Sequence, residues 1–286
     1  MQTLTVLVGP PGSGKSTFTE NSVDTVYVNQ DSQGKDGHLN IFKLALQGNK
    51  NILVDRMNFS KEQRARYLVP AKEAGYLTHI IVLQVPKQEC IKRCNNRYNH
   101  PTIKTDLDAK RANSFFFKSY ERPTPDEAHS VTFITQFETK KRQAIIVDID
   151  GTIANIEHRT HFVRGPGKKN WKDFFANMDK DTPNEWCKDL INRYKEDHLI
   201  VLCSGRPDSY REVTEQWLKK HNIFFDELYM RPRDDQRADS IIKEIILDFE
   251  LSPRYNITMW IDDRKQVIDK IRERGIFVLD CAGGAY

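Results

Sequence analysis

A single glycine-rich motif constrains the fold of this chain more than any other feature. It runs from Gly9 to Thr17 and reads Gly-Pro-Pro-Gly-Ser-Gly-Lys-Ser-Thr, directly after the apolar segment 3–8 and before a helical pattern. The spacing is that of the G-x-x-x-x-G-K-[ST] loop, whose backbone N–H groups surround a phosphate while the start of the helix adds partial positive charge. Because such loops lie at the carboxyl end of a strand, the motif predicts an α/β sheet.

The same loop predicts nucleotide binding. Lys15 is expected to reach the β- and γ-phosphates of ATP, and the Ser16 hydroxyl is placed to bind Mg²⁺. The full set of expected nucleotide-binding residues in the loop is Gly9, Gly12, Ser13, Gly14, Lys15, Ser16 and Thr17. A chance glycine-rich turn is the alternative, and the intact motif between a strand and a helix argues against it.

Two blocks of the 286-residue chain each alternate strand and helix patterns, which is typical of mainly parallel sheets covered by helices. In the first block we expect strands at 3–8, 26–29, 51–55 and 78–85 and helices at 15–22, 38–48, 60–75, 86–98 and 106–120. In the second we expect strands at 143–148, 198–203, 227–230, 257–261 and 276–280 and helices at 184–195, 208–221, 237–249 and 264–274. The Pro-rich segment 121–128 and one more expected strand at 131–134 separate them. We therefore predict two doubly wound α/β domains, 1–140 and 141–286.

Composition narrows the class of protein. Apolar residues make up 38% and charged residues 29%, as in soluble globular proteins. No apolar run approaches the roughly 20 residues of a membrane helix, and five cysteines without metal or CxxC spacing indicate free thiols. We expect no membrane association and a cytoplasmic location, in the host for a bacteriophage protein. Residues 1–140 hold 19 Lys and Arg against 14 Asp and Glu; this fits a polyanionic partner, or only a solvated surface.

Three polar positions in the first block follow expected strands or share an expected helix. Asp31 comes just after strand 26–29, where a carboxylate can accept the proton of an attacking hydroxyl; capping the next turn is the alternative. Asp55 ends strand 51–55 and can hold Mg²⁺ through water, orient the loop, or simply form a turn. Arg93 and Arg97 are four apart, so on one helix they could close over ATP, or lie in solvent.

The second block opens with two carboxylates after a strand, Asp148 and Asp150, followed by Gly151 and Thr152. This arrangement resembles the haloacid-dehalogenase phosphatase family. The resemblance implies that Asp148 attacks phosphorus to form an acyl phosphate, and that Asp150 protonates the leaving oxygen and then activates water. Two anions this close require a cation, which Mg²⁺ supplies.

Residues further along the chain strengthen this resemblance. Ser204 ends the next strand with a hydroxyl suited to a phosphoryl oxygen, and Lys243 can neutralise the phosphoaspartate. Asp262 and Asp263 end another strand and, with Asp148 and Asp150, are the expected Mg²⁺ ligands. Taken singly, each has a simpler explanation as a turn serine, a surface lysine or a capping aspartate.

The kinase and phosphatase patterns together resemble the polynucleotide kinase–phosphatases of bacteriophage type, in the phage order. The matching segments are 9–17, 29–34, 54–59 and 64–67 with Arg93 and Arg97, then Arg159, 204–206, 239–243 and 262–267. The resemblance implies that Asp31 is the general base and that Arg93 and Arg97 contact the ATP phosphates. It also implies that Arg159 and Arg206 help to bind substrate. We further assign substrate-binding roles to Asp55, Arg56, Ser204 and Gly205.

One position departs from the phage pattern. Phage enzymes carry an arginine three residues after the base, which contacts the 3′-phosphate of the acceptor, whereas this chain has Gly34. Lys35, Arg56 or Arg64 could take over that contact. The segment 155–183 is expected to form a small cap, in which Trp171 or Phe174 stacks a base or packs the cap onto the core.

The resulting hypothesis is an enzyme that transfers the ATP γ-phosphate to 5′-OH ends of DNA or RNA and removes 3′-phosphates, so that a ligase can seal them. A small-molecule kinase (for nucleosides or sugars) fused to a nucleotide phosphatase is an alternative. A non-catalytic end-binding subunit is another, and self-association as a homo-oligomer stays open.

Overall fold

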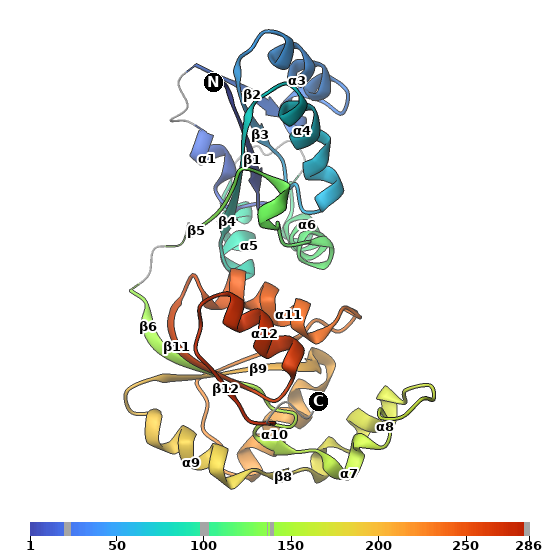
Figure 1. The fold of residues 1–286 in the computed structure, drawn as a ribbon. Coiled ribbons are helices and arrows are strands. Elements are labelled where there is room, and N and C mark those ends of the chain that lie inside the picture. The colour runs from blue at the N-terminus through green and yellow to red at the C-terminus, as the bar shows by residue number, and fades with distance from the viewer. Residues whose placement is uncertain (20–23, 98–102, 136, 138–139, 283–286) are drawn as a thin grey trace. The chain divides into compact units, whose positions relative to one another are not determined.

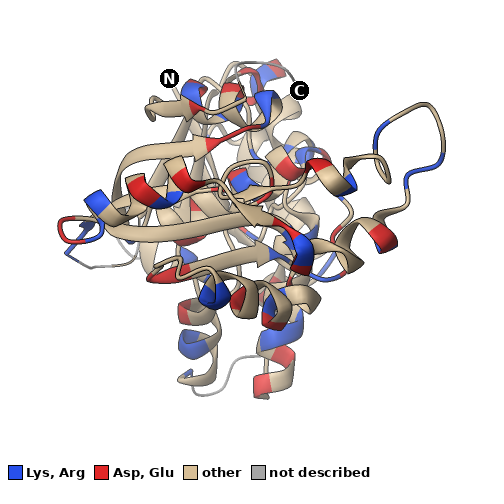
Figure 2. Ribbon diagram, turned by 90° about the horizontal axis from the view of Figure 1, so that it is seen from below, with Lys and Arg blue, Asp and Glu red and all other residues tan. Residues whose placement is uncertain are grey.

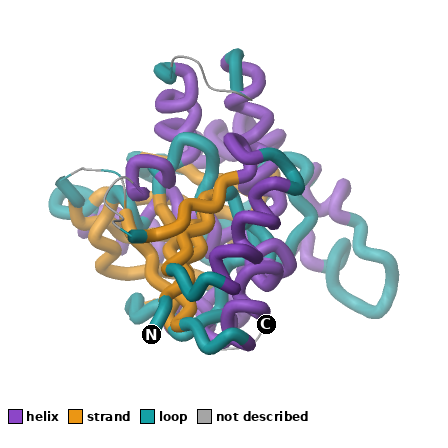
Figure 3. Tube along the Cα trace, turned by 90° about the horizontal axis from the view of Figure 1, so that it is seen from above, coloured by secondary structure: helices purple, strands orange, loops and turns teal. Residues whose placement is uncertain are grey.

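The computed structural model describes residues 1–19, 24–97, 103–135, 137 and 140–282. The chain divides into two compact units, Met1–Thr139 and Lys140–Tyr286, which we call the N-terminal and C-terminal units. Each contains its own five-stranded sheet with helices packed beside it (Figures 1 and 3). None of the helices in the described residues is both long and apolar enough to cross a membrane.

The sheet of the N-terminal unit is entirely parallel, in the order β2-β3-β1-β4-β5. Its strands are β1 (Thr3–Val8), β2 (Thr25–Asn29), β3 (Asn51–Asp55), β4 (Leu77–Gln84) and β5 (Ser130–Thr135). The four aliphatic residues of the central strand β1, which are Leu4, Val6, Leu7 and Val8, are fully buried, as expected for a parallel strand covered on both faces. Every strand expected in the first block is therefore present.

Helices connect these strands: α1 (Lys15–Thr19), α2 (Gln30–Gln33), α3 (Gly37–Gln47), α4 (Lys61–Glu73), α5 (Lys87–Asn95), α6 (Asp106–Ser119) and the short 3₁₀ turn η1 (Pro125–Glu127). Helix α3 packs against β2 and β3, and α4 against β1 and β4. The short helix α2 was not expected. Helix α5 ends three residues earlier than expected; residue 98 of that expectation, and residues 20–22 of the first helix, lie outside the described part.

The C-terminal sheet is also entirely parallel, in the order β10-β9-β6-β11-β12. Its strands are β6 (Arg142–Val147), β9 (Leu199–Pro207), β10 (Glu227–Arg231), β11 (Tyr255–Asp262) and β12 (Val278–Asp280). Alternate residues of β6 face opposite sides: Ala144 and Ile146 pack in one apolar core, Ile145 and Val147 in another. Both faces are thus buried, which confirms the doubly wound fold.

Helices cover the two faces of this sheet. On one side lie α11 (Asp239–Ile246), its π-helical continuation η4 (Leu247–Leu251) and α12 (Lys265–Glu273); on the other lie α9 (Glu185–Tyr194) and α10 (Arg211–Lys220), preceded by the 3₁₀ turn η3 (Asp208–Tyr210). The expected cap segment contains the antiparallel pair β7 (Ala154–Asn155) and β8 (Thr182–Pro183), with α7 (Glu157–Thr160), α8 (Trp171–Ala176) and the 3₁₀ turn η2 (Met178–Lys180) between them. The loop that joins α7 to α8 contains several basic residues (Figure 2).

The strand order creates a crevice at one edge of the C-terminal sheet. From β6 the chain proceeds to β9 and β10 on one side, and then crosses to β11 and β12 on the other. The loops after β6 and β11 therefore leave in opposite directions, which is where ligands bind in open α/β sheets. Asp148 directly follows β6 and Asp262 is the last residue of β11, so the topology brings these two carboxylates together.

Candidate active sites

The glycine-rich loop of the N-terminal unit lies between β1 and α1, as the motif requires. Gly12 has a φ of 87°, and a Cβ atom there would lie 2.3 Å from the carbonyl oxygen of Cys90. Only glycine fits this conformation and this contact. The Lys15 ammonium donates to the carbonyl oxygens of Gly9 and Pro10, each at 2.9 Å, so the lysine is folded over its own loop.

A hydroxyl and a carboxylate meet beside this loop. The Ser16 hydroxyl donates to Asp55 Oδ2 at 3.1 Å, because the parallel register of β1 and β3 places Asp55 next to Leu7 at the end of β1. Asp55 is buried and also accepts from the Tyr27 hydroxyl and from Asn29 Nδ2. Hydroxyl and carboxylate oxygens are the ligands that Mg²⁺ prefers, so this pair fits a Mg²⁺ ion bound next to a triphosphate.

Two further predicted residues lie within electrostatic reach of Lys15. Burial lowers the pKa of Lys15; Asp55 and Asp31 oppose this effect and Arg97 adds to it, and the net pKa is below the usual value. Asp31 is exposed in the first turn of α2. The cap of that helix is Asn29, whose side chain accepts from the Ser32 N–H at 3.0 Å. The alternative reading of Asp31 as a capping residue is therefore wrong.

The two arginines of the expected lid do not share a helix. Arg93 lies on α5 and its Nε is 2.8 Å from Glu89 Oε1. Arg97 is exposed and lies beyond the end of α5, because the chain leaves the helix at Asn96. The expectation that both arginines project from one helical face is thus wrong. Arg97 nevertheless contributes to the lowered pKa of Lys15 through its positive charge.

The three basic residues that could replace the missing acceptor contact differ in how accessible they are to a ligand. Arg64 is fully buried and pairs with Glu127 through two parallel hydrogen bonds of 2.7 and 2.9 Å, so it joins α4 to η1 and is not accessible to a ligand. Arg56 is half-buried at the end of β3, where its Nη1 donates to the Tyr67 hydroxyl at 3.0 Å. His38 Nε2 holds the same hydroxyl at 2.9 Å. Lys35 is exposed.

The C-terminal unit gathers buried carboxylates around one lysine. Ligand oxygens of Asp148, Asp262 and Asp263 lie within 4.8 Å of one another. Lys243, fully buried on α11, has its Nζ 2.9 Å from Asp148 Oδ1 and 2.7 Å from Asp262 Oδ2. The same Nζ lies 3.3 Å from Asp239 Oδ2. One ammonium therefore contacts three carboxylates, and Asp263 adds a fourth carboxylate to the cluster.

The charge balance of this cluster favours a bound cation. Burial raises the pKa of Asp148 well above its usual value; Lys243 opposes the shift, while Asp262 and Asp263 add to it. Burial and the neighbouring Asp262 raise the pKa of Asp263 to about 6. Asp263 Oδ1 is buried and lacks a hydrogen-bond partner among the described residues. A divalent ion held by Asp148, Asp262 and Asp263 would satisfy this oxygen and the excess negative charge.

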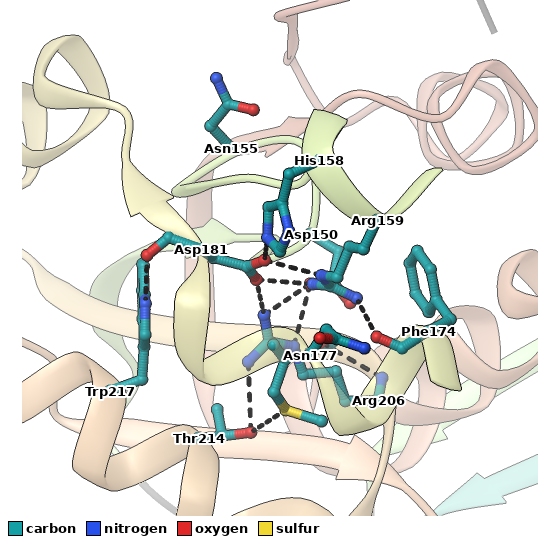
Figure 4. A network of polar contacts seen from close by, with 12 residues as sticks. Asp150, Asn155, His158, Arg159, Phe174, Asn177, Asp181, Arg206, Thr214 and Trp217 are labelled. Carbon is teal, nitrogen blue, oxygen red and sulfur yellow. Dashed lines mark hydrogen bonds and ion pairs between the residues drawn. The ribbon is translucent and has the colours of Figure 1, made fainter. Parts of the chain in front are cut away.

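Asp150 belongs to a different network, drawn in Figure 4. Its Oδ1 accepts from Arg206 Nε and Nη2 at 2.9 and 2.6 Å, and from Arg159 Nη2 at 2.6 Å. Both arginines also donate to Asp181, at 2.6 to 3.0 Å, and His158 Nε2 lies 2.9 Å from Asp181 Oδ1. Burial alone would raise the pKa of Asp150, but Arg206 and Arg159 outweigh it and hold that pKa well below the usual range.

This network corrects two expectations. The Asp150 carboxylate faces arginines and is not one of the clustered metal-ligand candidates. Arg159 and Arg206 are fully buried, and all three side-chain nitrogens of each donate to protein acceptors, so in this structure they hold Asp150 and are not open to substrate. The sequence interpretation missed Asp181, because no local pattern distinguishes it from other polar residues of the cap.

A pocket of about 730 Å³ opens over Asp148, Asp150 and Gly205. Ser204 is fully buried next to it. A Cβ atom on Gly205 would lie 2.2 Å from Asp239 Oδ1, so the glycine lets the carboxylate approach the backbone. In the cap, both Phe174 and Trp171 line the pocket. Phe174 is buried, with the centre of its ring 4.1 Å from the Arg159 guanidinium, whereas Trp171 is 42% exposed. Phe174 therefore packs the cap, and Trp171 remains available for stacking.

Comparisons with known proteins agree with this division. Residues 142–286, half of the chain, match the family model described as "Polynucleotide kinase PNKP phosphatase domain". Residues 4–123 match a model described as "AAA domain". In general, domains of these kinds use a nucleotide and a divalent metal ion.

Individual relatives were also found. A "Putative bifunctional polynucleotide kinase/RNA ligase" of Autographa californica nuclear polyhedrosis virus is 22% identical over 93% of this chain. A "Transcription factor bHLH140" of Arabidopsis thaliana is 35% identical over 35% of it. The chain spans only 40% and 12% of the lengths of these relatives. A solved structure named "Structure of Pnkp1/Rnl/Hen1 complex" aligns over all of this chain and 98% of its own, with 26% identity and a TM-score of 0.44.

The match over half of the chain coincides with the unit that contains the aspartate cluster and the Asp150 network. The chain belongs to the family of the polynucleotide kinase PNKP phosphatase domain.

Proposed function

We propose that this protein repairs nucleic-acid ends, with an ATP-dependent 5′-hydroxyl kinase in the N-terminal unit and a Mg²⁺-dependent 3′-phosphatase in the C-terminal unit. The observation that carries the proposal is the buried cluster of Asp148, Asp262, Asp263 and Lys243, which lies at the crevice of the sheet and within the matched family segment. The products, a 5′-phosphate and a 3′-hydroxyl, are the ends that a ligase joins.

In the phosphatase, the Asp148 carboxylate attacks phosphorus and forms an acyl phosphate as the bond to the 3′-oxygen breaks. Mg²⁺, held by Asp148, Asp262 and Asp263, would offset the negative charge of the carboxylates and the phosphate. Lys243 keeps Asp148 in place and neutralises part of this charge. These contacts direct one carboxylate at the phosphorus atom.

Proton transfer in this reaction falls to Asp150. A phosphate dianion in the pocket adds negative charge beside Asp150 and raises its pKa, which favours the protonated form that donates to the leaving 3′-oxygen. The ionised Asp150, held by Arg159 and Arg206, then takes a proton from the water that hydrolyses the acyl phosphate. Phosphate and free Asp148 result, and the two arginines act as positioning residues.

In the kinase, Lys15 would turn from its own loop to the β- and γ-phosphates, with Ser16 and Asp55 holding Mg²⁺. Asp31, exposed near Lys15, would accept the proton of the attacking 5′-hydroxyl. Arg56 is the best-placed residue for the acceptor phosphate, because it is half-buried and held by Tyr67, whereas Arg64 is committed to Glu127.

A nucleic-acid substrate is favoured by the family match and by the names of the relatives. The baculovirus relative is named as a kinase joined to an RNA ligase, so we infer that a polynucleotide ligase acts on the products of this protein. The exposed Trp171 and the basic loop between α7 and α8 suit a strand end in the phosphatase pocket.

The decisive experiment assays 5′-phosphorylation and 3′-dephosphorylation of DNA and RNA oligonucleotides with Lys15→Ala and Asp148→Asn variants. Each variant should lose one activity and keep the other, because each removes a group used in only one unit. Loss of both activities in either variant, or of neither, contradicts the assignment. Equal turnover of a nucleoside 3′-phosphate and a 3′-phosphorylated oligonucleotide would favour the small-molecule alternative.

A further inference from the structure

A buried histidine of the N-terminal unit has no part in the reactions described above. His38 lies on α3 and is only 1% exposed. Both of its ring nitrogens have a polar partner: Nδ1 lies 2.9 Å from the carbonyl oxygen of Gly34, and Nε2 lies 2.9 Å from the Tyr67 hydroxyl. What this histidine does for the protein therefore depends on what its two partners hold.

The Tyr67 hydroxyl connects His38 to Arg56. Tyr67 is fully buried on α4, and its ring packs edge-on against Phe42, with the ring centres 5.2 Å apart. Its oxygen accepts from Arg56 Nη1 at 3.0 Å. Because the Gly34 carbonyl oxygen can only accept, His38 Nδ1 donates to it, which leaves Nε2 to accept from the Tyr67 hydroxyl. The tyrosine hydroxyl is thus held from both sides.

The Gly34 carbonyl connects the same histidine to the turn that carries Asp31. Gly34 ends α2, and its N–H donates to the carbonyl oxygen of Gln30 at 3.0 Å. Asp31 is the second residue of this short helix. A continuous path of hydrogen bonds therefore leads from the helix of Asp31 through the histidine and the tyrosine to Arg56.

The position of Arg56 depends on this path. Arg56 directly follows β3 and is half-buried. Within the described part of the chain, the Tyr67 hydroxyl is the only hydrogen-bond acceptor of its guanidinium, and no carboxylate forms an ion pair with it. Its remaining donors are available to an anion, while a single hydroxyl decides where the guanidinium lies.

We propose that His38 is a positioning residue of the kinase, which fixes the Tyr67 hydroxyl and thereby holds Arg56 at the phosphate of the acceptor strand. The inference rests on the proposed kinase function, in which Asp31 accepts the proton of the 5′-hydroxyl and Arg56 binds the acceptor phosphate. A long side chain that is already held in place loses less conformational entropy when it binds. Because His38 also contacts the α2 turn, it holds the arginine and the general base relative to each other, as a substrate that reaches both requires.

Two replacements of His38 separate its two contacts. The amide of His38→Asn can take the place of Nδ1 and keep the contact with Gly34, but it leaves the Tyr67 hydroxyl without an acceptor. The longer side chain of His38→Gln brings an amide oxygen near the position of Nε2, where it can accept from Tyr67. We expect His38→Asn to raise the kinase KM for a 5′-OH oligonucleotide about two- to tenfold, the effect of one hydrogen bond. Neither kcat nor the KM for ATP should change much, and His38→Gln should recover most of the loss.

A control and a double variant assign the effect to Arg56. His129 belongs to the same unit and is hydrogen-bonded to Thr78 near the start of β4, at the edge of the sheet opposite the phosphate-binding loop. His129→Asn should therefore match wild type. Arg56→Gln should raise the oligonucleotide KM at least as much as His38→Asn does. Adding His38→Asn to Arg56→Gln should cause no further rise, because the residue that His38 positions is gone.

The KM for ATP also shows whether the N-terminal unit of each variant is folded, because the phosphate-binding loop belongs to the same sheet. If His38→Asn does not fold, His38→Met decides. It fills the buried site with an apolar side chain and removes the contact with Tyr67, so the same rise in the oligonucleotide KM is expected.

The possible negative results have different meanings. If wild-type protein phosphorylates no 5′-OH oligonucleotide, the proposed kinase function fails, and this inference with it. If Arg56→Gln leaves the oligonucleotide KM unchanged, the roles of Arg56 and His38 are both overturned. If Arg56→Gln raises that KM but His38→Asn does not, or raises it equally with and without Arg56, the kinase function stands and the role of His38 is overturned.

Discussion

Asp181 offers the sharpest test of how the C-terminal unit is built. It is buried with Asp150, Arg159 and Arg206, so that two carboxylates balance two guanidinium groups. Replacing Asp181 by Asn keeps the shape and removes one negative charge. Arg159 then loses charge-assisted partners at 2.6 and 2.7 Å, and Arg206 one at 3.0 Å.

The expected cost is large for a unit of this size. Removing one partner of a buried ion pair typically costs about 3–5 kcal/mol, because the other charge is left without compensation. Total stabilities of domains are about 5–15 kcal/mol, so Asp181→Asn should remove a large share of the stability of the C-terminal unit. Phosphatase activity should fall as well, since Asp150 loses the support of correctly placed arginines. The kinase should keep its activity.

Tryptophan fluorescence is the natural assay, because Trp171, Trp186, Trp217 and Trp260 all lie in the C-terminal unit of the intact chain. Trp217 is especially suited, since its Nε1 donates to the carbonyl oxygen of Asp181 at 2.8 Å. Urea unfolding would be followed for wild type, Asp181→Asn, Arg159→Gln and the double variant. The double variant restores the balance of charge, so it should be less destabilised than the sum of the single variants.

The reasoning is refuted by either of two results. A loss of less than about 1 kcal/mol in Asp181→Asn would mean that the network does not hold the unit together. Strict additivity in the double variant would mean that Asp181 and Arg159 do not interact in solution. A change in kinase activity would show that the two units are not independent in the assay.

Three further predictions follow from single contacts. The pKa of Asp263 in the metal-free unit is raised to about 6, above the usual range of an aspartate, so this unit should lose stability as pH rises from about 4 to about 6. Mg²⁺ affinity should weaken as pH falls below about 6, because the protonated carboxyl binds the ion poorly. Fluorescence titrations with Mg²⁺ at about pH 5 and pH 7.5 would check this, and equal affinities would contradict it. Gly205→Ala should displace Asp239, because the added Cβ would lie 2.2 Å from its carboxylate, and the overpacking should lower the free energy of unfolding by about 1–3 kcal/mol. Urea unfolding and 3′-phosphatase assays should both detect the change. Gly167→Ala is the matched control, since a Cβ there meets nothing within 4 Å. Tyr67→Phe should release Arg56, because it removes the hydroxyl that accepts from Arg56 Nη1. The loss of one hydrogen bond, worth about 0.5–1.5 kcal/mol, should raise the kinase KM for the oligonucleotide about two- to tenfold, with little change in KM for ATP. An unchanged oligonucleotide KM would show that Arg56 does not bind the acceptor.

The accuracy of the sequence interpretation follows the range of the interactions involved. The loop from Gly9 to Thr17 and the Asp148–Asp150 motif depend on neighbouring residues, and the alternation of apolar and polar residues reports burial directly. Strands could therefore be located to within a few residues. Helix ends were harder to predict. The end of α5 at Asn95 was missed, because the periodicity of the following residues gives no sign that the chain leaves the helix there.

The ion-pair partners of buried polar residues could not be predicted from local sequence patterns. Arg64 is a plausible ligand for a phosphate until the fold pairs it with Glu127, 63 residues away. Asp150 resembles a metal ligand until Arg206, 56 residues away, reaches its carboxylate. Asp181 has no motif, and its role exists only because the cap closes over Asp150.

Short-range periodicity and spacing were sufficient to predict the two parallel sheets, the phosphate-binding loop and the carboxylates at the ends of β6 and β11. Which buried charges pair, and which arginines hold Asp150, depends on contacts that exist only in the folded protein. The physical reason is that a buried charge must find its partner wherever the fold places one, and that distance along the chain carries no information about it.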